Sequence, residues 1–277
     1  MRERAWGSTT TKVPVIGQGT WHMELDDRRA CIAALQAGID AGMSHIDTAE
    51  LYGSGEVEEI VAEAIRGRRE QVFLVSKVLP QNASRKGTRR SLEASLERLG
   101  TDYLDGYLLH WAGRYPLEDT LATFAELKDE GKIRSFGVSN FDADELDAAV
   151  AIAGEGRIAC NQVLYHLKER AIEHAVIPFC EQHGITVVAY SPFGSGDFPA
   201  RDPVLRDVAA ARGATVYQVA LAFLTRRSSV AAIPKAARAD HARDNAAAGD
   251  LVLDDGEVAR LEEAFPLGRR RRGVPFL

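Results

Sequence analysis

The segment HIDTAELY, from His45 to Tyr52, decides the fold prediction, because a short apolar stretch ends there in a carboxylate that is followed by a phenol. Two later segments have the same form. SKV at 76–78 ends an apolar run with Lys77, and LLHW at 108–111 ends another with His110. Strands of a parallel sheet that is covered on both faces are apolar along their length. We therefore predict buried parallel strands whose carboxyl ends carry polar side chains.

Around this segment, short β-branched runs alternate with amphipathic helical stretches, after a polar hairpin at Arg4–Pro14. The expected strands are Val15–Gly19, a strand closed by His45–Asp47, Val72–Val78, Leu104–His110, Ile133–Ser139, Ala159–Val163, Thr186–Ser191 and Val230–Pro234. The expected helices are Asp27–Ala41, Glu56–Ile65, Ser84–Leu99, Leu117–Glu130, Asp142–Ala153, His174–His183, Pro203–Arg212, Val216–Arg226, Asp240–Ala247 and Glu257–Ala264. Units of about 30 residues predict a single (β/α)8 TIM barrel over residues 1–277, with an N-terminal β-hairpin and a short C-terminal substrate loop. A doubly wound sheet is the alternative.

The composition limits the class of protein. Of 277 residues, 45% are hydrophobic and 27% are charged, and the net charge of -6 argues against nucleic acid as a partner. The short run Arg269 to Arg272 is interpreted as a solvated tail. No stretch approaches the roughly 20 apolar residues of a membrane span, and the N-terminus has no apolar signal region. Three cysteines without a CxxC pair indicate reduced thiols. We expect a cytoplasmic monomer that binds neither nucleic acid nor membrane.

A polar or aromatic residue stands at or just past the end of each predicted strand. These residues are Trp21, Asp47, Lys77, His110, Asn140, Gln162, Tyr190 and Lys235. In a barrel those strand ends share one rim, which is where active sites lie. Packing gives no reason for such residues to recur strand after strand, so the rim is the candidate active site.

The rim combines groups that suit proton transfer to a carbonyl oxygen. A free tyrosine, with a pKa of about 10, is a weak acid that a neighbouring cation can tune. Lys77 favours the phenolate of Tyr52 and so acts to lower its pKa, while Asp47 holds Lys77. His110 can orient the carbonyl and stabilise its developing charge. The sequence indicates a carbonyl reductase that needs no metal.

At this point the chain resembles the aldo-keto reductase family over nearly its whole length. The matching segments are GQGTW (17–21), DTAELYG (47–53), SK (76–77), HW (110–111), GVSNF (137–141), NQ (161–162), AYSPFG (189–194) and IPK (233–235). Each is weak alone, but all eight occur in order at suitable spacing. The short length is similar to prokaryotic members, including those like diketogluconate reductases.

The resemblance implies an NADP-dependent reductase that uses NADPH and, more weakly, NADH, with a catalytic tetrad of Asp47, Tyr52, Lys77 and His110. It implies that Ser139, Asn140 and Gln162 bind the nicotinamide carboxamide and that Tyr190 stacks on its ring. The full set of implied cofactor residues is Gly19, Thr20, Ser139, Asn140, Gln162, Tyr190, Ser191, Phe193, Ser195, Lys235, Ala236, Arg238, His241, Asp244 and Asn245. In this resemblance, the residues from Ser191 to Ser195 lie along the pyrophosphate. Those from Lys235 onward lie at the adenosine end, where a helix is expected to begin at Ala236.

The implied substrate residues are Trp21, Tyr52, Leu79, His110 and Trp111. The two tryptophans give flat apolar walls, and Leu79 and a short C-terminal loop offer little to hold a large ligand. A small aldehyde, ketone or dicarbonyl is therefore expected. Two departures concern the cofactor: the family usually has arginine where His241 stands, and a hydroxyl residue where Ala236 stands.

Alternative interpretations remain at this level. Asp47 and Lys77 can form a simple salt bridge at the rim. Lys77 can also act as a Schiff-base lysine of a lyase or aldolase, a role that a desolvated lysine fills. A nucleotide-binding regulatory barrel with little turnover is a third possibility. The GSG segments at 53–55 and 194–196 match no phosphate-loop pattern.

Overall fold

The computed structural model describes residues 1–277 and contains eight parallel strands in one sheet, with the spatial order β10-β9-β8-β7-β6-β5-β4-β3. Hydrogen bonds also join the two ends of this order. The amide of Gly17 donates to Ala232 at 2.8 Å, and that of Gly19 donates to Pro234 at 3.1 Å. The sheet is therefore closed. The predicted barrel is confirmed, and the doubly wound alternative is wrong. The strands are β3 (Gln18–Gly19), β4 (His45–Asp47), β5 (Phe73–Val78), β6 (Leu104–Leu109), β7 (Ile133–Ser139), β8 (Ile158–Leu164), β9 (Thr186–Tyr190) and β10 (Val230–Ala232).

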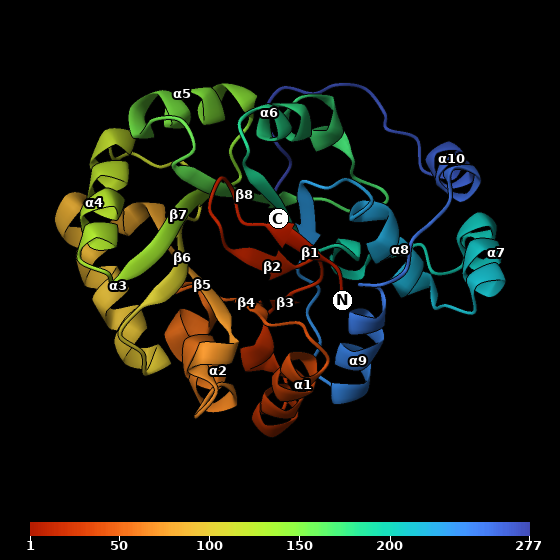
Figure 1. Cartoon of the computed structure of the whole chain (residues 1–277), viewed down its shortest axis with the longest axis horizontal. Coiled ribbons are helices and arrows are strands. Elements are labelled where there is room, and N and C mark those ends of the chain that lie inside the picture. The colour runs from red at the N-terminus through yellow and green to blue at the C-terminus, as the bar shows by residue number, and fades with distance from the viewer.

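Helices form a ring around the barrel (Figure 1). They are α1 (Arg28–Asp40), α2 (Glu56–Ala64), α3 (Arg85–Leu99), α4 (Leu117–Asp129), α5 (Ala143–Ala153), α6 (Val176–Gln182), α7 (Pro203–Arg212), α8 (Val216–Leu224), α9 (Ala239–Ala247) and α10 (Asp255–Ala264). Side-chain caps explain several starts: Asp27, Ser84 and Asp142 each accept a hydrogen bond from the backbone at the third helical residue. Most ends lie within two residues of the sequence prediction. Helix α9 also lies within one residue of the listed range, but the separate expectation that a helix begins at Ala236 is wrong, because residues 236–238 are not helical.

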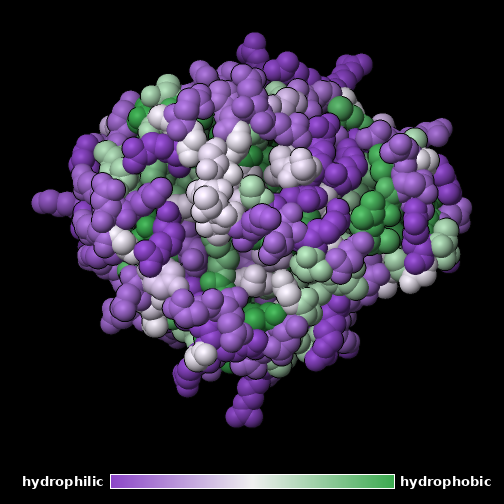
Figure 2. Space-filling model, viewed as in Figure 1, coloured by the Kyte–Doolittle hydropathy of each residue, from purple (hydrophilic) through white to green (hydrophobic).

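A hairpin of β1 (Glu3–Ala5) and β2 (Lys12–Pro14) crosses the end of the barrel that faces the viewer in Figure 1. Trp6, which follows β1, is 1% exposed and donates its indole N–H to the hydroxyl of Ser135 at 2.8 Å. Gly106 makes room for this ring, because a Cβ there would lie 3.2 Å from it. Ser135 and Gly106 lie in the first halves of β7 and β6, so Trp6 plugs the amino-terminal end of the barrel. The same face is largely hydrophilic on its surface (Figure 2).

The core has two parts. A cluster of 62 buried residues fills mainly the layer between strands and helices, and a cluster of eight, which includes Trp6, Val75 and Leu108, fills the barrel interior. Above the plug, His45 is fully buried, and both of its ring nitrogens lack a hydrogen-bond partner. The three cysteines are free and buried. No helix has the length and apolar character needed to cross a membrane.

Candidate active site

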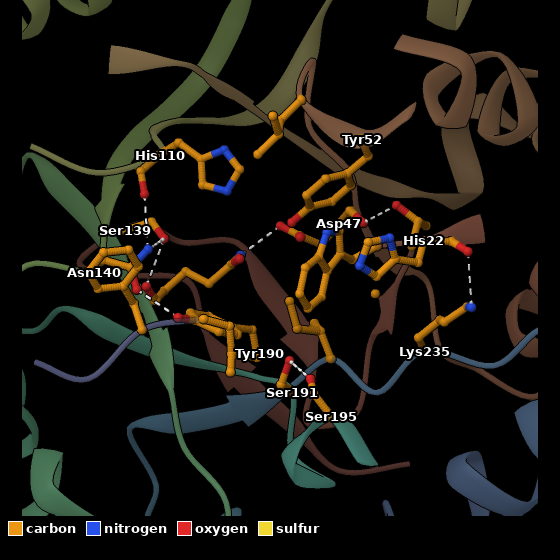
Figure 3. Close-up of a pocket in the computed structure, with 18 of the residues that line it drawn as sticks. His22, Asp47, Tyr52, His110, Ser139, Asn140, Tyr190, Ser191, Ser195 and Lys235 are labelled. Atoms are coloured by element: carbon orange, nitrogen blue, oxygen red, sulfur yellow. Dashed lines mark hydrogen bonds between the residues drawn. The ribbon is translucent and has the colours of Figure 1, made fainter. Parts of the chain in front are cut away.

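A cavity of about 610 Å³ opens at the carboxyl ends of the strands, opposite the Trp6 plug. Figure 3 shows side chains from several strand ends pointing into it. Its lining residues are Gly19, Thr20, Trp21, His22, Asp47, Leu51, Tyr52, His110, Trp111, Ser139, Asn140, Gln162, Tyr190, Ser191, Pro192, Phe193, Ser195, Ile233, Lys235, Phe276 and Leu277. Most of the site residues expected from the sequence are therefore brought together in one cavity.

Lys77 lies beneath this cavity with no exposed surface, and all three of its N–H groups are used. Its Nζ donates to Asp47 Oδ1 at 2.6 Å, to the carbonyl of Thr48 at 2.9 Å and to the phenol oxygen of Tyr52 at 3.0 Å. Burial disfavours the ammonium, but the negative charge of Asp47 and the hydrogen bonds outweigh it, so the pKa of Lys77 is raised. A charged lysine without a free N–H is a poor amine nucleophile, which counts against the Schiff-base alternative.

Tyr52 accepts a hydrogen bond from Lys77, so its own proton is left to point elsewhere, and its side chain lines the cavity. Burial raises the pKa of this phenol, and Lys77 only partly offsets that rise. The expected direction of the lysine's influence is therefore present, but the net result in the ligand-free protein is a pKa above the ordinary value. A glycine-rich turn, Tyr52–Gly55, holds the phenol at the rim, with Gly53 and Ser54 both at a φ of 53°.

His110 lies beside Tyr52, with ring centroids 5.9 Å apart, and is 8% exposed. Burial and the positive charge of Lys77 lower its pKa to about 2, so its imidazole is neutral. Its Nδ1 is buried without a hydrogen-bond partner. A neutral imidazole between Tyr52 and Trp111 can donate one hydrogen bond to a ligand oxygen in the cavity without bringing a charge.

The amide side chains at the ends of β7 and β8 are tied to the same centre. Gln162 Nε2 donates to Asp47 Oδ2 at 2.7 Å, so the carboxylate is held by an amide on one oxygen and by Lys77 on the other. Asn140 Nδ2 donates to the carbonyl of His110 at 3.1 Å, and its Oδ1 accepts from the Tyr190 hydroxyl at 2.9 Å. Asn140 has a left-handed φ of 63°, a strained conformation that asparagine tolerates better than most residues.

Two further groups of expected cofactor residues also line the cavity. A Cβ at Gly19 would lie 2.5 Å from the carbonyl of Ile233, so glycine is required where the first and last barrel strands meet. Thr20 donates its hydroxyl to the carbonyl of Asp47 at 2.8 Å. On the other side, Ser191 and Ser195 both have positive φ, and their hydroxyls are 3.1 Å apart. Phe193, between them, packs edge-on against Phe198 and Tyr217.

The adenosine-end residues differ from the expectation. Only Lys235 lines the cavity, whereas Ala236, Arg238, His241, Asp244 and Asn245 lie outside it. Helix α9 begins at Ala239, with Arg238 at the N-cap, so the helix expected from Ala236 is wrong. Asp244 accepts hydrogen bonds from Thr215, the N-cap of α8, and from Gln218 on that helix. Leu79 also does not line the cavity, and its amide donates to Glu50 at 2.7 Å. It directly follows the end of β5.

Several lining residues were not predicted from the sequence, chiefly His22, Leu51, Phe276 and Leu277. The last two belong to the C-terminal tail, which returns to the rim because the β8–α6 connection holds it. Arg170 donates to the carbonyl of Phe265 at 2.6 Å, and His174 contacts that of Gly268 at 3.2 Å. The tail is short and forms part of the cavity wall, in line with the short C-terminal substrate loop expected from the sequence.

Known proteins match the whole chain. A family model described as Aldo/keto reductase family matches residues 15–265. Methylglyoxal reductase YeaE of Escherichia coli (strain K12) is 43% identical over 276 residues, which are 98% of this chain and 97% of that protein. A crystal structure of an aldo/keto reductase from Klebsiella pneumoniae in complex with NADP and acetate is 43% identical, covers 100% of both chains and has a TM-score of 0.94. A structure assigned as a 2,5-diketo-D-gluconic acid reductase B is 30% identical, with a TM-score of 0.87 and coverage of 99% and 96%. This chain therefore belongs to the aldo-keto reductase family, which the eight matching segments of its sequence indicated.

Proposed function

We propose that this protein reduces small aldehydes, ketones and especially α-dicarbonyls such as methylglyoxal with NADPH, and that Tyr52 is the proton donor. One observation carries the proposal. Lys77 donates its three N–H groups to Asp47, Thr48 and Tyr52. Because Tyr52 accepts this hydrogen bond, its own proton is free for a ligand in the cavity. Membership of the family supports the reaction class.

Each member of the tetrad has one task in this proposal. Tyr52 gives its proton to the carbonyl oxygen as negative charge develops there, and the adjacent ammonium of Lys77 stabilises the phenolate that remains. Asp47 holds Lys77 in place through a 2.6 Å ion pair. His110 donates a hydrogen bond to the same carbonyl oxygen and aligns it with Tyr52. When bound, NADPH supplies the hydride for the carbonyl carbon.

The residues present fit a nicotinamide cofactor. Gln162 has its amide nitrogen fixed on Asp47, which leaves its carbonyl oxygen to accept from the carboxamide. Ser139, Asn140 and Tyr190 line the same end of the cavity, and Ser191, Phe193 and Ser195 extend the lining toward the rim. Arg238, His241, Asp244 and Asn245 lie beyond the cavity and are proposed for the adenosine end only by family resemblance.

The cavity walls support a small substrate. Trp21, Trp111, Leu51 and the tail residues Phe276 and Leu277 surround the space above Tyr52 with apolar surface. The 43% identical relative is named a methylglyoxal reductase, and we extend that substrate class to this chain. We also propose that residues 1–277 work as one domain, as a monomer in the cytoplasm. A molar mass near that of one chain in size-exclusion chromatography with light scattering tests the monomer.

The test is a panel of substrates: methylglyoxal, diacetyl, short aldehydes and polycyclic ketones. Turnover of each is measured as the loss of NADPH absorbance. Turnover of the small dicarbonyls is expected to exceed that of the polycyclic ketones by a large factor. Activity restricted to the bulky ketones contradicts the proposed substrate class. Borohydride treatment with a carbonyl substrate should leave Lys77 unmodified; a covalent Lys77 adduct in peptide mass spectra favours the lyase alternative instead.

A further inference from the structure

Lys235 is the only lysine or arginine among the residues that line the cavity. It stands just past β10, where its Nζ reaches across to the loop that follows β3 (Figure 3). There it forms an ion pair with the carboxylate of Asp26 and donates to the carbonyl of His22 at 3.2 Å. The one lining cation that an anionic ligand can meet is therefore already bonded to a carboxylate.

A ligand phosphate can displace Asp26 from this ion pair, but the backbone keeps Asp26 close to Lys235 after displacement. The side chains of Lys235 and Asp26 are 32% and 37% exposed, and ion pairs between groups in contact with water contribute little stability. A ligand phosphate can therefore take the place of the carboxylate. Asp26 does not move far when it is displaced, because its backbone N–H donates to the carbonyl of Met23 at 3.1 Å and closes a 3-10 turn.

A displaced Asp26 keeps a negative charge beside the phosphate, and two like charges repel each other. The repulsion grows with the charge on the ligand at this point. The next cation along the chain has the same arrangement, since Arg238 pairs with Asp240 through Nε at 3.0 Å. The two cations at this end are thus balanced by two carboxylates.

We propose that Asp26 is a specificity-determining residue for the dinucleotide cofactor: by neutralising Lys235 it weakens the preference for NADPH over NADH. The extra phosphate of NADPH carries the charge that Asp26 opposes. This inference rests on the proposed function, because it requires that the cavity takes a nicotinamide dinucleotide. It predicts an enzyme that uses both cofactors, with an acidic residue setting the ratio.

The experiment measures dissociation constants of NADPH and NADH by quenching of tryptophan fluorescence, since Trp21 lines the cavity. Asp26→Asn keeps the size of the side chain and removes its charge. The matched control is Asp102→Asn, which removes an exposed charge without a partner before β6, at the plugged end of the barrel. Asp26→Asn should tighten NADPH roughly three- to tenfold and NADH less than about twofold, while the control changes neither. Added salt should shrink the difference.

A double-mutant cycle tests whether the effect passes through Lys235. In a Lys235→Met background, Asp26→Asn should lose at least half of its effect on NADPH. An effect that persists in full there overturns the role of the pair, as does an NADPH-to-NADH ratio that Asp26→Asn leaves unchanged. A wild-type protein that binds neither cofactor contradicts the proposed function itself. One that binds NADPH but is indifferent to Asp26 contradicts only this inference.

Discussion

The ion pairs at the bottom of the cavity are buried, whereas those at and near its mouth are exposed to water. At the bottom, Asp47 and Lys77 are at most 1% exposed, and each polar atom that joins them has a defined partner. Lys235 at the mouth and Arg238 outside the cavity are both exposed, and each pairs with a nearby carboxylate that water and salt can replace. In the proposed function, the residues of the chemical step are therefore held rigidly, whereas we expect single surface substitutions to adjust recognition of the cofactor's charged end.

The largest effect is expected at the bottom, from Tyr52→Phe. This change removes the proposed proton donor and keeps the ring, so the reduction rate should fall by about 10²–10⁴-fold. NADPH affinity should stay near the wild-type value, because the phenol is not needed to hold the cofactor. Single-turnover kinetics and a fluorescence titration give the two quantities. Wild-type turnover in this variant removes Tyr52 from the mechanism.

Lys77→Met should lower the reduction rate nearly as much as Tyr52→Phe, and it should also change the pH dependence of that rate. The reduction rate falls as pH rises through the pKa of its general acid. Lys77 acts to lower the pKa of Tyr52, so without it that pKa rises further and the alkaline limb of the rate profile moves to higher pH. Profiles of kcat/KM for both proteins decide the matter. An alkaline limb at the same pH in both shows that the two side chains are not coupled.

His45→Phe should change stability rather than rate, and the effect is smaller. Burial and the charge of Lys77 lower the pKa of His45 to about 3, whereas its unfolded value is about 6.5. Below that unfolded value the unfolded chain binds a proton that the folded chain does not, so stability falls as pH falls, by about 1.4 kcal/mol per pH unit. Between pH 6.5 and 5 the wild type should lose about 2 kcal/mol more than the variant. Urea unfolding at both pH values checks this, and equal losses contradict a neutral buried imidazole.

The smallest effect is expected at the mouth, from removal of Phe276 and Leu277. Both are more than half exposed in the ligand-free protein, so they can contribute only a modest apolar contact to a substrate. KM for methylglyoxal should rise roughly fivefold with kcat little changed, the pattern of lost uniform binding. Bulkier ketones should gain relative to methylglyoxal. A large fall in kcat instead indicates that the tail orders the catalytic residues.

The same contrast explains what the sequence could predict. Asp47, Lys77 and Gln162 lie in the last residues of buried strands, and Asn140 directly follows one, so the barrel geometry alone brings them to one rim. Tail residues such as Phe276 follow no periodic element, and their return to the rim depends on contacts of Arg170 and His174 that no local pattern announces.

At the adenosine end, one expectation is wrong and one contact was not predicted, for related reasons. A helix from Ala236 was inferred from the strand end before it, yet α9 begins at Ala239. The cationic character of Lys235 was clear from the chain, but its partner, Asp26, lies 209 residues away and is exposed. Charge partners between distant surface loops leave no periodic trace in a sequence.

The plug at the amino-terminal end of the barrel has a consequence for the order of events in turnover. Trp6, hydrogen-bonded to Ser135, closes this end of the barrel, so we expect protons to reach the centre from the cavity side. In the proposed chemistry Tyr52 is a phenolate after each reduction, and it regains its proton only from water that enters through the same mouth as the substrate. The alcohol occupies that passage until it leaves. In this mechanism we expect product departure to come before the acid is restored.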